Sequence, residues 1–359
     1  MRNRATILLL VLVAAAAADQ SRLQLAGWKS IPPLPEPVTN NAVVSVAAKG
    51  RDFVISFAGL GSGKSYDDTH AKTYVFDSAD NGWREVEAIP GDAGRLAATA
   101  VAVGERAFVF GGYTVAEDGS EESTRWVHAF DPVSSDFEER QSMPVPVDDA
   151  LAVSYEDRYV YLISGWHDLG NVNLVQRYDV QSDSWAQATP IPGRAVFGHA
   201  GGIVANTIVY CDGVAIEPHV DRRRDFVANA ECYAGIIDKE EGRRIDWRRI
   251  KQHPGKPRYR MAAAGSVDHN GVLFVGGSDN PYNYDGIGYD GNASSPSSDA
   301  LLFSLETSTW ERVSIEGPAT MDHRGLLSFQ GGWLTVGGML DDQEVTDSIA
   351  SYVLEELGD

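Results

Sequence analysis

FVISFAG at residues 53–59 and AFVFGG at residues 107–112 show the pattern that decides the fold, a β-branched and aromatic run that ends in glycine. Similar runs recur as YVYLISG at 159–165, IVYCDG at 208–213, VLFVGG at 272–277 and WLTVGG at 333–338. An aromatic marker accompanies each run, at intervals of 48 to 63 residues: Trp28, Trp83, Phe137, Trp185, Trp247 and Trp310. Strand-like runs at a regular period of this length are typical of an all-β repeat protein.

The order of the markers predicts how the repeat closes. Trp28 precedes the first glycine end, whereas no marker follows Gly337 and Gly338. We therefore expect the N-terminal strand to complete the sheet that residues 348–354 begin, which removes open sheet edges. The predicted fold is an all-β, six-bladed β-propeller of four-stranded antiparallel blades, with residues 27–354 as a single domain. The aromatic markers are expected to pack between neighbouring sheets.

The period and the glycine ends resemble those of the kelch and galactose-oxidase-like propellers over nearly the whole of residues 27–354. Within that group, GGSDNPYNYDGIGYDGNASSPSSDALLF at 276–303 and GGMLDDQEVTDS at 337–348 are similar to the N-acetylneuraminate epimerase (sialic acid mutarotase) family. The resemblance implies an exported six-bladed propeller that acts on a sialic-acid-like sugar. The stretch CDGVAIEPHVDRRRDF at 211–226 departs from that family, because Val214 stands where its catalytic Glu is expected.

The first residues have the charged, apolar and small-residue order of a secretory signal. MRNR is followed by an apolar run and by Ala14 to Ala18, and the run is shorter than the roughly 20 residues that span a bilayer. We expect cleavage after residues 1–18, a periplasmic or secreted protein and no membrane insertion after cleavage. The chain carries 51 acidic and 30 basic residues, which argues against nucleic acid as a partner.

Cysteine occurs twice, at Cys211 and Cys232. The two residues are predicted on opposite arms of one hairpin, so that a cross-strand disulfide is expected. Two buried thiols are the alternative. With no further cysteines, a copper-radical site of the galactose oxidase type is not predicted. The Asp-rich segments lack the ligand spacing of a calcium loop, and no metal or other cofactor is expected.

Two sets of loops should meet at one mouth of the propeller: the connections between blades, and the loops between the second and third strands of each blade. Guanidinium groups bind carboxylates, and aromatic faces pack on sugar rings, so these loops predict a site for a small, acidic sugar or a glycan. The alternative for the arginines is a structural role, tying adjacent blades to backbone carbonyls. The candidate ligand-binding residues are Arg95, Tyr113, Trp166, His167, Arg194, Arg260, Tyr282, Tyr284 and Arg324.

Sugar mutarotation needs a base for the anomeric hydroxyl and an acid for the ring oxygen. Glu217 lies three residues after Val214 and is the first catalytic candidate. His199 and His323 are the others, because histidine exchanges protons near neutral pH. Two functions stay open on the sequence: a sugar epimerase or mutarotase, and a propeller that binds a carbohydrate or a protein without catalysis.

Overall fold

The computed structural model describes residues 22–91, 93–221 and 223–357, so the predicted signal segment 1–18 lies outside the described residues. Almost all regular structure is β, as predicted. Four sheets have four antiparallel strands each: β2 (Ala42–Ala48), β3 (Arg51–Leu60), β4 (Thr69–Asp77) and β5 (Gly82–Val86); β6 (Thr99–Val103), β7 (Arg106–Phe110), β10 (Val127–Asp131) and β11 (Asp136–Glu139); β12 (Leu151–Tyr155), β13 (Tyr159–Ile163), β16 (Val175–Asp179) and β17 (Ser184–Ala188); β18 (Ala200–Val204), β19 (Thr207–Cys211), β22 (Cys232–Ile237) and β23 (Ile245–Ile250).

A further sheet has eight strands and contains both ends of the described chain. Its order is β24 (Ala262–Ser266), β25 (Gly271–Val275), β26 (Ala300–Ser304), β27 (Thr309–Ile315), β1 (Leu23–Gly27), β30 (Ile349–Glu356), β29 (Gly332–Val336) and β28 (Leu327–Phe329). Strand β1 pairs antiparallel with β30, which confirms the predicted pairing of the N-terminal strand with the C-terminal sheet. It also pairs in parallel with β27 over Leu23 to Leu25, a contact that the repeat did not predict.

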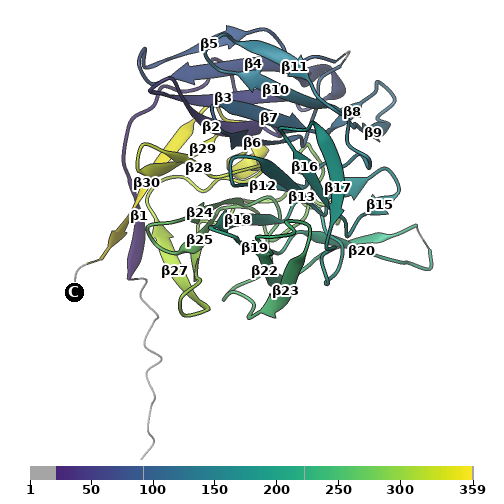
Figure 1. Cartoon of the computed structure of the whole chain (residues 1–359). Coiled ribbons are helices and arrows are strands. Elements are labelled where there is room, and N and C mark those ends of the chain that lie inside the picture. The colour runs from purple at the N-terminus through teal and green to yellow at the C-terminus, as the bar shows by residue number, and fades with distance from the viewer. Residues whose placement is uncertain (1–21, 92, 222, 358–359) are drawn as a thin grey trace, which may run out of the picture.

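The sheets are arranged around a central axis (Figure 1), with the first strand of each unit innermost. Neighbouring inner strands contact one another in the order β28, β2, β6, β12, β18 and β24. A channel of about 260 Å³ is lined by residues from all of these strands, including Val44, Ala100, Val153, Gly202 and Ala264. Small and β-branched residues predominate here because the inner strands crowd together near the axis.

The aromatic markers join adjacent units. The indole N–H of Trp83 donates to Pro32 O at 2.8 Å, and that of Trp185 donates to Gln141 O at 2.8 Å. Trp310 repeats the contact on Lys251 O at 2.7 Å. Each of these rings thus packs on its own sheet, and its indole N–H bonds a backbone carbonyl in the connection that leaves the preceding sheet. Half-buried tryptophans commonly combine the two kinds of contact.

Three short hairpins extend from the loops between second and third strands: β8 (Tyr113–Val115) with β9 (Glu121–Ser123), β14 (Trp166–His167) with β15 (Gly170–Asn171), and β20 (Val214–Glu217) with β21 (Asp225–Ala228). Two 3-10 turns, Tyr66–Asp68 and Asp341–Gln343, lie in the corresponding loops of other units. Isolated bridges pair each of these loops with the connection before the inner strand, such as Leu96 with Tyr113 and Asp148 with Trp166. The two sets of loops therefore share one face, which we call the mouth. Among the described residues, no helix is long and apolar enough to cross a bilayer.

Candidate ligand site at the mouth

A ring of left-handed residues surrounds the axis just below the mouth. One residue after each bridge has a positive φ: Asn40, Ala97, Asp149, Gly198, Arg260 and Asp322. Backbone hydrogen bonds of 2.8 to 3.2 Å link consecutive ring positions. In the first, Ala97 N–H donates to Asn40 O, and in the last, His323 N–H donates to Arg260 O. The N–H of Asn40 closes the circle on Asp322 Oδ2 at 3.1 Å. Non-glycine residues rarely adopt a left-handed conformation. Here this conformation turns the side chains of the ring residues toward the central axis.

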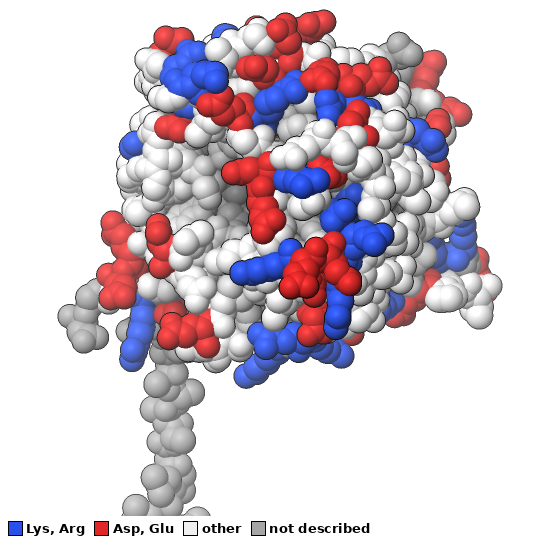
Figure 2. All heavy atoms as spheres, viewed as in Figure 1, with Lys and Arg blue, Asp and Glu red and all other residues white. Residues whose placement is uncertain are grey.

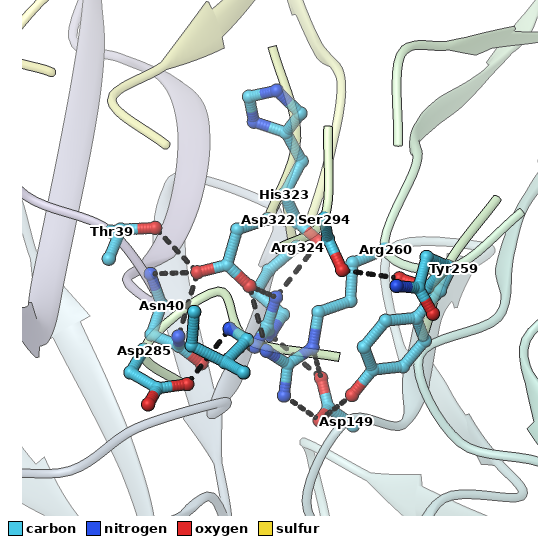
Figure 3. A network of polar contacts seen from close by, with 12 residues as sticks. Thr39, Asn40, Asp149, Tyr259, Arg260, Asp285, Ser294, Asp322, His323 and Arg324 are labelled. Carbon is cyan, nitrogen blue, oxygen red and sulfur yellow. Dashed lines mark hydrogen bonds and ion pairs between the residues drawn. The ribbon is translucent and has the colours of Figure 1, made fainter. Parts of the chain in front are cut away.

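Four ring side chains and one neighbour form a buried ion network that plugs the channel (Figure 3). The Arg260 guanidinium donates to Asp149 at 3.2 and 2.6 Å and to Asp322 at 2.9 Å. Arg324 lies 3.0 Å from Asp149 and donates to Asp322 at 3.2 Å, and it also donates to Asn40. Two cations thus meet two carboxylates with almost no solvent contact, as buried charges require.

The network fixes the charge of its members. Burial acts to raise the pKa of Asp322, but Arg260 and Arg324 outweigh it and hold that pKa below its usual value. Burial likewise acts against the charged form of Arg260, yet Asp149 and Asp322 keep its pKa well above the ordinary range. The arginine charges at the axis are therefore already neutralised within the protein, and little of them is left for an acidic ligand.

Above the plug lies a pocket of about 280 Å³, which we call the mouth pocket. Half of its lining residues are aromatic and half carry carboxyl, guanidinium or amide groups: Tyr113, Trp166, Phe197, Phe226, Tyr284 and Tyr289, with Glu121, Asp148, Asp149, Arg224, Arg260 and Asn283. The aromatic rings support one another, because Phe226 stacks on Tyr289 at 4.1 Å between centroids and packs against Trp166 at 5.7 Å. Pockets of this character are typical of small-molecule sites.

Arg224 covers part of this aromatic wall. Its guanidinium lies 4.6 Å from the centre of the Trp166 ring and 5.7 Å from that of Phe226, and it donates to Leu169 O at 3.1 Å. No carboxylate partner holds it among the interactions of the described residues. A planar cation stacked on indole at a pocket wall is suited to bind a carboxylate or hydroxyl groups of a ligand.

Two carboxyls in the mouth pocket have pKa values above their usual range. Asp148 is buried, and desolvation together with the charge of Asp149 raises its pKa well above the usual value, although Ser123 donates to it at 2.7 Å. Glu121 has more solvent contact, and partial desolvation raises its pKa also. A buried carboxyl whose pKa is raised well above its usual value, such as Asp148, can act as a general acid or as a hydrogen-bond donor to a sugar oxygen.

The structure brings four of the predicted ligand-binding residues to the mouth pocket: Tyr113, Trp166, Arg260 and Tyr284. Tyr282 is fully buried beneath it, with its ring 5.1 Å from that of Tyr259. Arg324 belongs to the plug. His167 faces away from the mouth pocket into a neighbouring groove.

The other two predicted ligand arginines lie elsewhere. Arg95 donates to Gly111 O at 3.2 Å and is buried, so that desolvation lowers its pKa to about 9. Its side chain anchors the connection before β6 to a backbone carbonyl of the same sheet, so its role is structural rather than ligand binding. Arg194 is on the exposed rim, 3.0 Å from Glu217. Of the four predicted ligand arginines, Arg194, Arg260 and Arg324 are thus paired with carboxylates and Arg95 with a backbone carbonyl: these are contacts within the protein. On the molecular face drawn in Figure 2, Lys and Arg lie among Asp and Glu.

The three predicted catalytic residues do not meet. Glu217 is exposed at the end of β20 and pairs with Arg194. His199 and His323 are buried below the plug and line a small cavity of about 30 Å³ on the channel side. Burial lowers the pKa of each histidine to about 4, so neither exchanges protons near neutral pH as the sequence suggested.

The predicted ligand-binding residues did not include the other eight residues that line the mouth pocket: Glu121, Asp148, Asp149, Phe197, Arg224, Phe226, Asn283 and Tyr289. A signal for Glu121 was present, because Asp118-Gly119 between short strand-like stretches predicts a hairpin turn. In the resulting hairpin Val115 pairs with Glu121 and Tyr113 with Ser123, which puts Glu121 on the same face as Tyr113. Val214 is buried and pairs with Ala228 within the third hairpin, away from the pocket lining.

The two cysteines are joined, with sulfur atoms 2.08 Å apart and Cys211 directly opposite Cys232 in the β19 and β22 pairing. Among the described residues, no three His, Cys, Asp or Glu side chains gather in a way that could hold a metal ion.

The buried histidines imply a pH dependence of stability. Because the pKa of His199 is about 4 in the folded chain and near 6.5 when unfolded, the unfolded chain binds the extra proton between these values. Stability is therefore expected to fall as the pH drops from about 6.5 to 4. His199→Leu should reduce this slope by up to about 1.4 kcal/mol per pH unit. Urea unfolding at pH 7, 6 and 5 measures the slope, and an unchanged slope in the variant would show that His199 does not contribute.

Radial four-stranded sheets around a plugged channel, with a loop-built pocket at one mouth, define the class of β-propellers. The chain matches the kelch motif at residues 94–144. It is 27% identical to Beta-scruin of Limulus polyphemus over 194 residues, which are 53% of this chain and 21% of that protein. It is 22% identical to Kelch-like protein 15 of Danio rerio over 253 residues, 70% of this chain and 40% of that protein. The chain thus spans less than half of these relatives.

The solved structure entitled "Structure of YjhT" has the same fold. It superposes with a TM-score of 0.71 and 14% sequence identity over 91% of this chain and 99% of that chain. This similarity, the motif and the sheet topology together support a kelch-repeat β-propeller.

Proposed function

We propose that this kelch propeller binds a sugar in the mouth pocket. The observation that carries the proposal is the combination, in one pocket, of an aromatic wall around Trp166 with buried carboxyl groups at Asp148 and Asp149. Sugars present apolar ring faces that pack on indole, and hydroxyls that need fixed hydrogen-bond partners. The guanidinium of Arg224 on the same wall supports a sugar that carries a carboxylate, such as a sialic-acid-like sugar.

The propeller that holds this pocket is proposed to have six blades. The eight-stranded sheet divides naturally into β24 to β27 and into β28, β29, β30 and β1, joined only through the short parallel pairing of β1 with β27. Each of the resulting four-stranded units is preceded by one left-handed ring residue. This regularity supports a count of six, in which the first blade is β2 to β5 and the last contains both chain ends.

Calorimetric titration of single sugars tests binding. N-acetylneuraminic acid, galacturonic acid, N-acetylglucosamine, galactose and glucose form the panel. Trp166→Ala should weaken any sugar that binds by about tenfold through the lost stacking surface, whereas Trp166→Phe should keep most of the affinity. If no sugar in the panel binds, or if the bound sugar is indifferent to Trp166→Ala, the mouth pocket is not a sugar site.

A second candidate is catalysis of anomeric interconversion, favoured by two carboxyls of the mouth pocket that differ in burial, the buried Asp148 and the more exposed Glu121. Glu121 would take the proton of the anomeric hydroxyl while the protonated Asp148 donates to the ring oxygen. The ring opens, the carbonyl end rotates, and closure reverses both transfers. These residues replace Glu217, His199 and His323 in the proposal, because they line the aromatic pocket and those three do not.

Proton NMR of freshly dissolved sugars tests catalysis. The wild-type chain should speed anomeric equilibration of a bound sugar, and Asp148→Asn should reduce the rate by about a hundredfold. If Glu217→Gln abolishes the activity and Asp148→Asn does not, the chemistry belongs to the rim near Arg194. If binding occurs without faster equilibration, the propeller is a carbohydrate-binding protein without catalysis.

Export to the periplasm or the exterior remains a proposal, based on the signal-like order of residues 1–18. The disulfide between Cys211 and Cys232 supports it, because disulfides persist in oxidising compartments. N-terminal sequencing of the protein recovered from the producing cell is expected to begin near Asp19. Recovery of the chain with Met1 intact, only in the cytoplasm, would contradict export.

A further inference from the structure

A second cavity, which we call the side groove, lies beside the mouth pocket. It measures about 540 Å³, within the range of about 300 to 1,000 Å³ that is common for small-molecule sites. Its lining combines an indole, prolines and polar groups: Thr114, Glu122, Ser123, Thr124, Arg125, Trp126, Pro144, Val145, Pro146, His167 and Asp168. The proposed sugar site does not use any of these residues.

Two hairpins form the partition between the cavities. In β8 and β9, Tyr113 and Glu121 line the mouth pocket, whereas the cross-strand pair of Thr114 and Glu122 lines the side groove. In β14, Trp166 lines the mouth pocket and His167 the side groove. Successive side chains of a strand point to opposite faces, so each hairpin serves both cavities. The two cavities are therefore immediate neighbours.

Two buried polar side-chain atoms of residues at the side groove have no hydrogen-bond partner among the described residues. Thr124 is 7% exposed, and its Oγ1 is buried without a hydrogen bond. His167 Nδ1 also lacks a hydrogen-bond partner and lies 3.7 Å from an Asp168 oxygen. Buried polar atoms are normally satisfied, so two orphaned groups in one cavity indicate that a ligand completes them.

Trp126 supplies the apolar surface of the side groove. Arg95 lies 5.3 Å from the centre of its ring, which helps to fix the indole. Pro144 and Pro146 border the same cavity. A fixed indole beside hydroxyl and carboxylate groups is the combination that suits a sugar ring, as at the mouth pocket.

A chain of hydrogen bonds connects the two cavities. Ser123 N donates to Asp168 Oδ1 at 2.7 Å on the groove side, and Ser123 Oγ donates to Asp148 Oδ2 at 2.7 Å on the mouth side. These two hydrogen bonds fix the position of the partition relative to both cavities. A ligand that extends from one cavity into the other would therefore contact a rigid surface.

We propose that the side groove is a second saccharide subsite, so that the ligand of this propeller is an oligosaccharide whose terminal unit enters the mouth pocket and whose next units lie against Trp126. The inference rests on the proposed sugar binding at the mouth. It extends that function from a single sugar to a chain, recognised by hydroxyl contacts to Thr124, His167 and Asp168.

Titration with oligosaccharides of increasing length tests the inference. N-acetylglucosamine and galacturonic acid, each as monomer and as dimer to hexamer, serve as probes of the full chain. In at least one series, affinity should rise by roughly tenfold from monomer to trimer, as expected for one added stacking contact and its hydrogen bonds. Trp126→Ala should remove this gain and leave the affinity of the monomer unchanged.

Thr124→Val serves as the second variant, because it keeps the shape of the side chain and removes only the unpartnered hydroxyl. It should fold with wild-type stability and lose part of the length-dependent gain. Trp166→Ala should weaken all lengths equally. If the monomer binds but length has no effect, or if the gain survives both groove variants, the side groove is not a subsite and the mouth function stands.

If neither monomers nor oligomers bind, the proposed function and this inference both fail. A screen of random heptapeptides gives the remaining outcome. The proposal would be overturned if Trp126→Ala abolished the binding of a peptide while no saccharide depended on Trp126. That result would assign the side groove to a peptide.

Discussion

Arg260→Met is expected to lower the free energy of unfolding by about 3–5 kcal/mol, because it leaves Asp149 and Asp322 buried with only Arg324 as a cation. The guanidinium is 3% exposed, so water cannot replace it. Methionine keeps a similar length, which limits the effect of lost packing. Urea unfolding followed by circular dichroism measures the difference at pH 7.

Arg194→Ala is the matched control for Arg260→Met. Arg194 forms an ion pair with Glu217 at a similar distance, 3.0 Å, but both side chains are exposed to water. Exposed pairs contribute about 0–1 kcal/mol, so the control should unfold almost as the wild type does. Equal losses for the two variants would show that the axial network is not a buried charge cluster.

Removal of the disulfide is expected to cost about 3 kcal/mol. Cys211 and Cys232 are 21 residues apart, and closing a loop of that size in the unfolded chain accounts for most of the effect in the chain-entropy view. The double variant Cys211→Ala with Cys232→Ala should therefore unfold at lower urea than the oxidised wild type. The hairpin of β20 and β21 lies inside this loop and should become more open to proteolysis.

Reductant supplies the control for the disulfide prediction. Dithiothreitol should destabilise the wild type towards the level of the double variant and have no effect on the variant itself. If reductant leaves wild-type unfolding unchanged although free-thiol titration shows that the bond is reduced, the disulfide does not stabilise the fold.

The repeat in the sequence was sufficient to predict the all-β architecture and the pairing of the chain ends. Strand runs that end in glycine show their period directly, and the displaced marker Trp28 indicates a strand shared between the termini. The parallel pairing of β1 with β27 could not be predicted in this way. It depends on the twist at the outer edges of two neighbouring units, which no local pattern records.

The sequence predicted which loops form the mouth, but not which side chains contact one another there. Loop topology brought Tyr113, Trp166 and Tyr284 to one pocket, as expected. The role of Arg260 depends on which carboxylates lie beside it at the axis, and these come from two other units. The role of Arg95 depends on its burial and on Gly111 O of its own unit. Sequence composition counts such arginines as free charge, whereas the fold neutralises them.

The catalytic candidates were misplaced for a related reason. His199 and His323 directly follow the left-handed ring residues Gly198 and Asp322, so a shift of one residue decides whether a side chain faces the mouth or the channel. Asp148 and Asp149 are a related case, because both line the mouth pocket but only Asp149, which has a left-handed backbone, also pairs with the arginines of the plug.

A crystal structure of the chain with the tightest sugar of the panel is the decisive measurement. We expect density for a sugar ring packed on Trp166, with hydroxyls bonded to Asp148 and within reach of Arg224, above an unchanged Arg260 network. A structure at saturating sugar in which the mouth pocket is empty, or in which the sugar is ordered only in the channel lined by Ala100 and Val153, would rule out the mouth pocket as the sugar site.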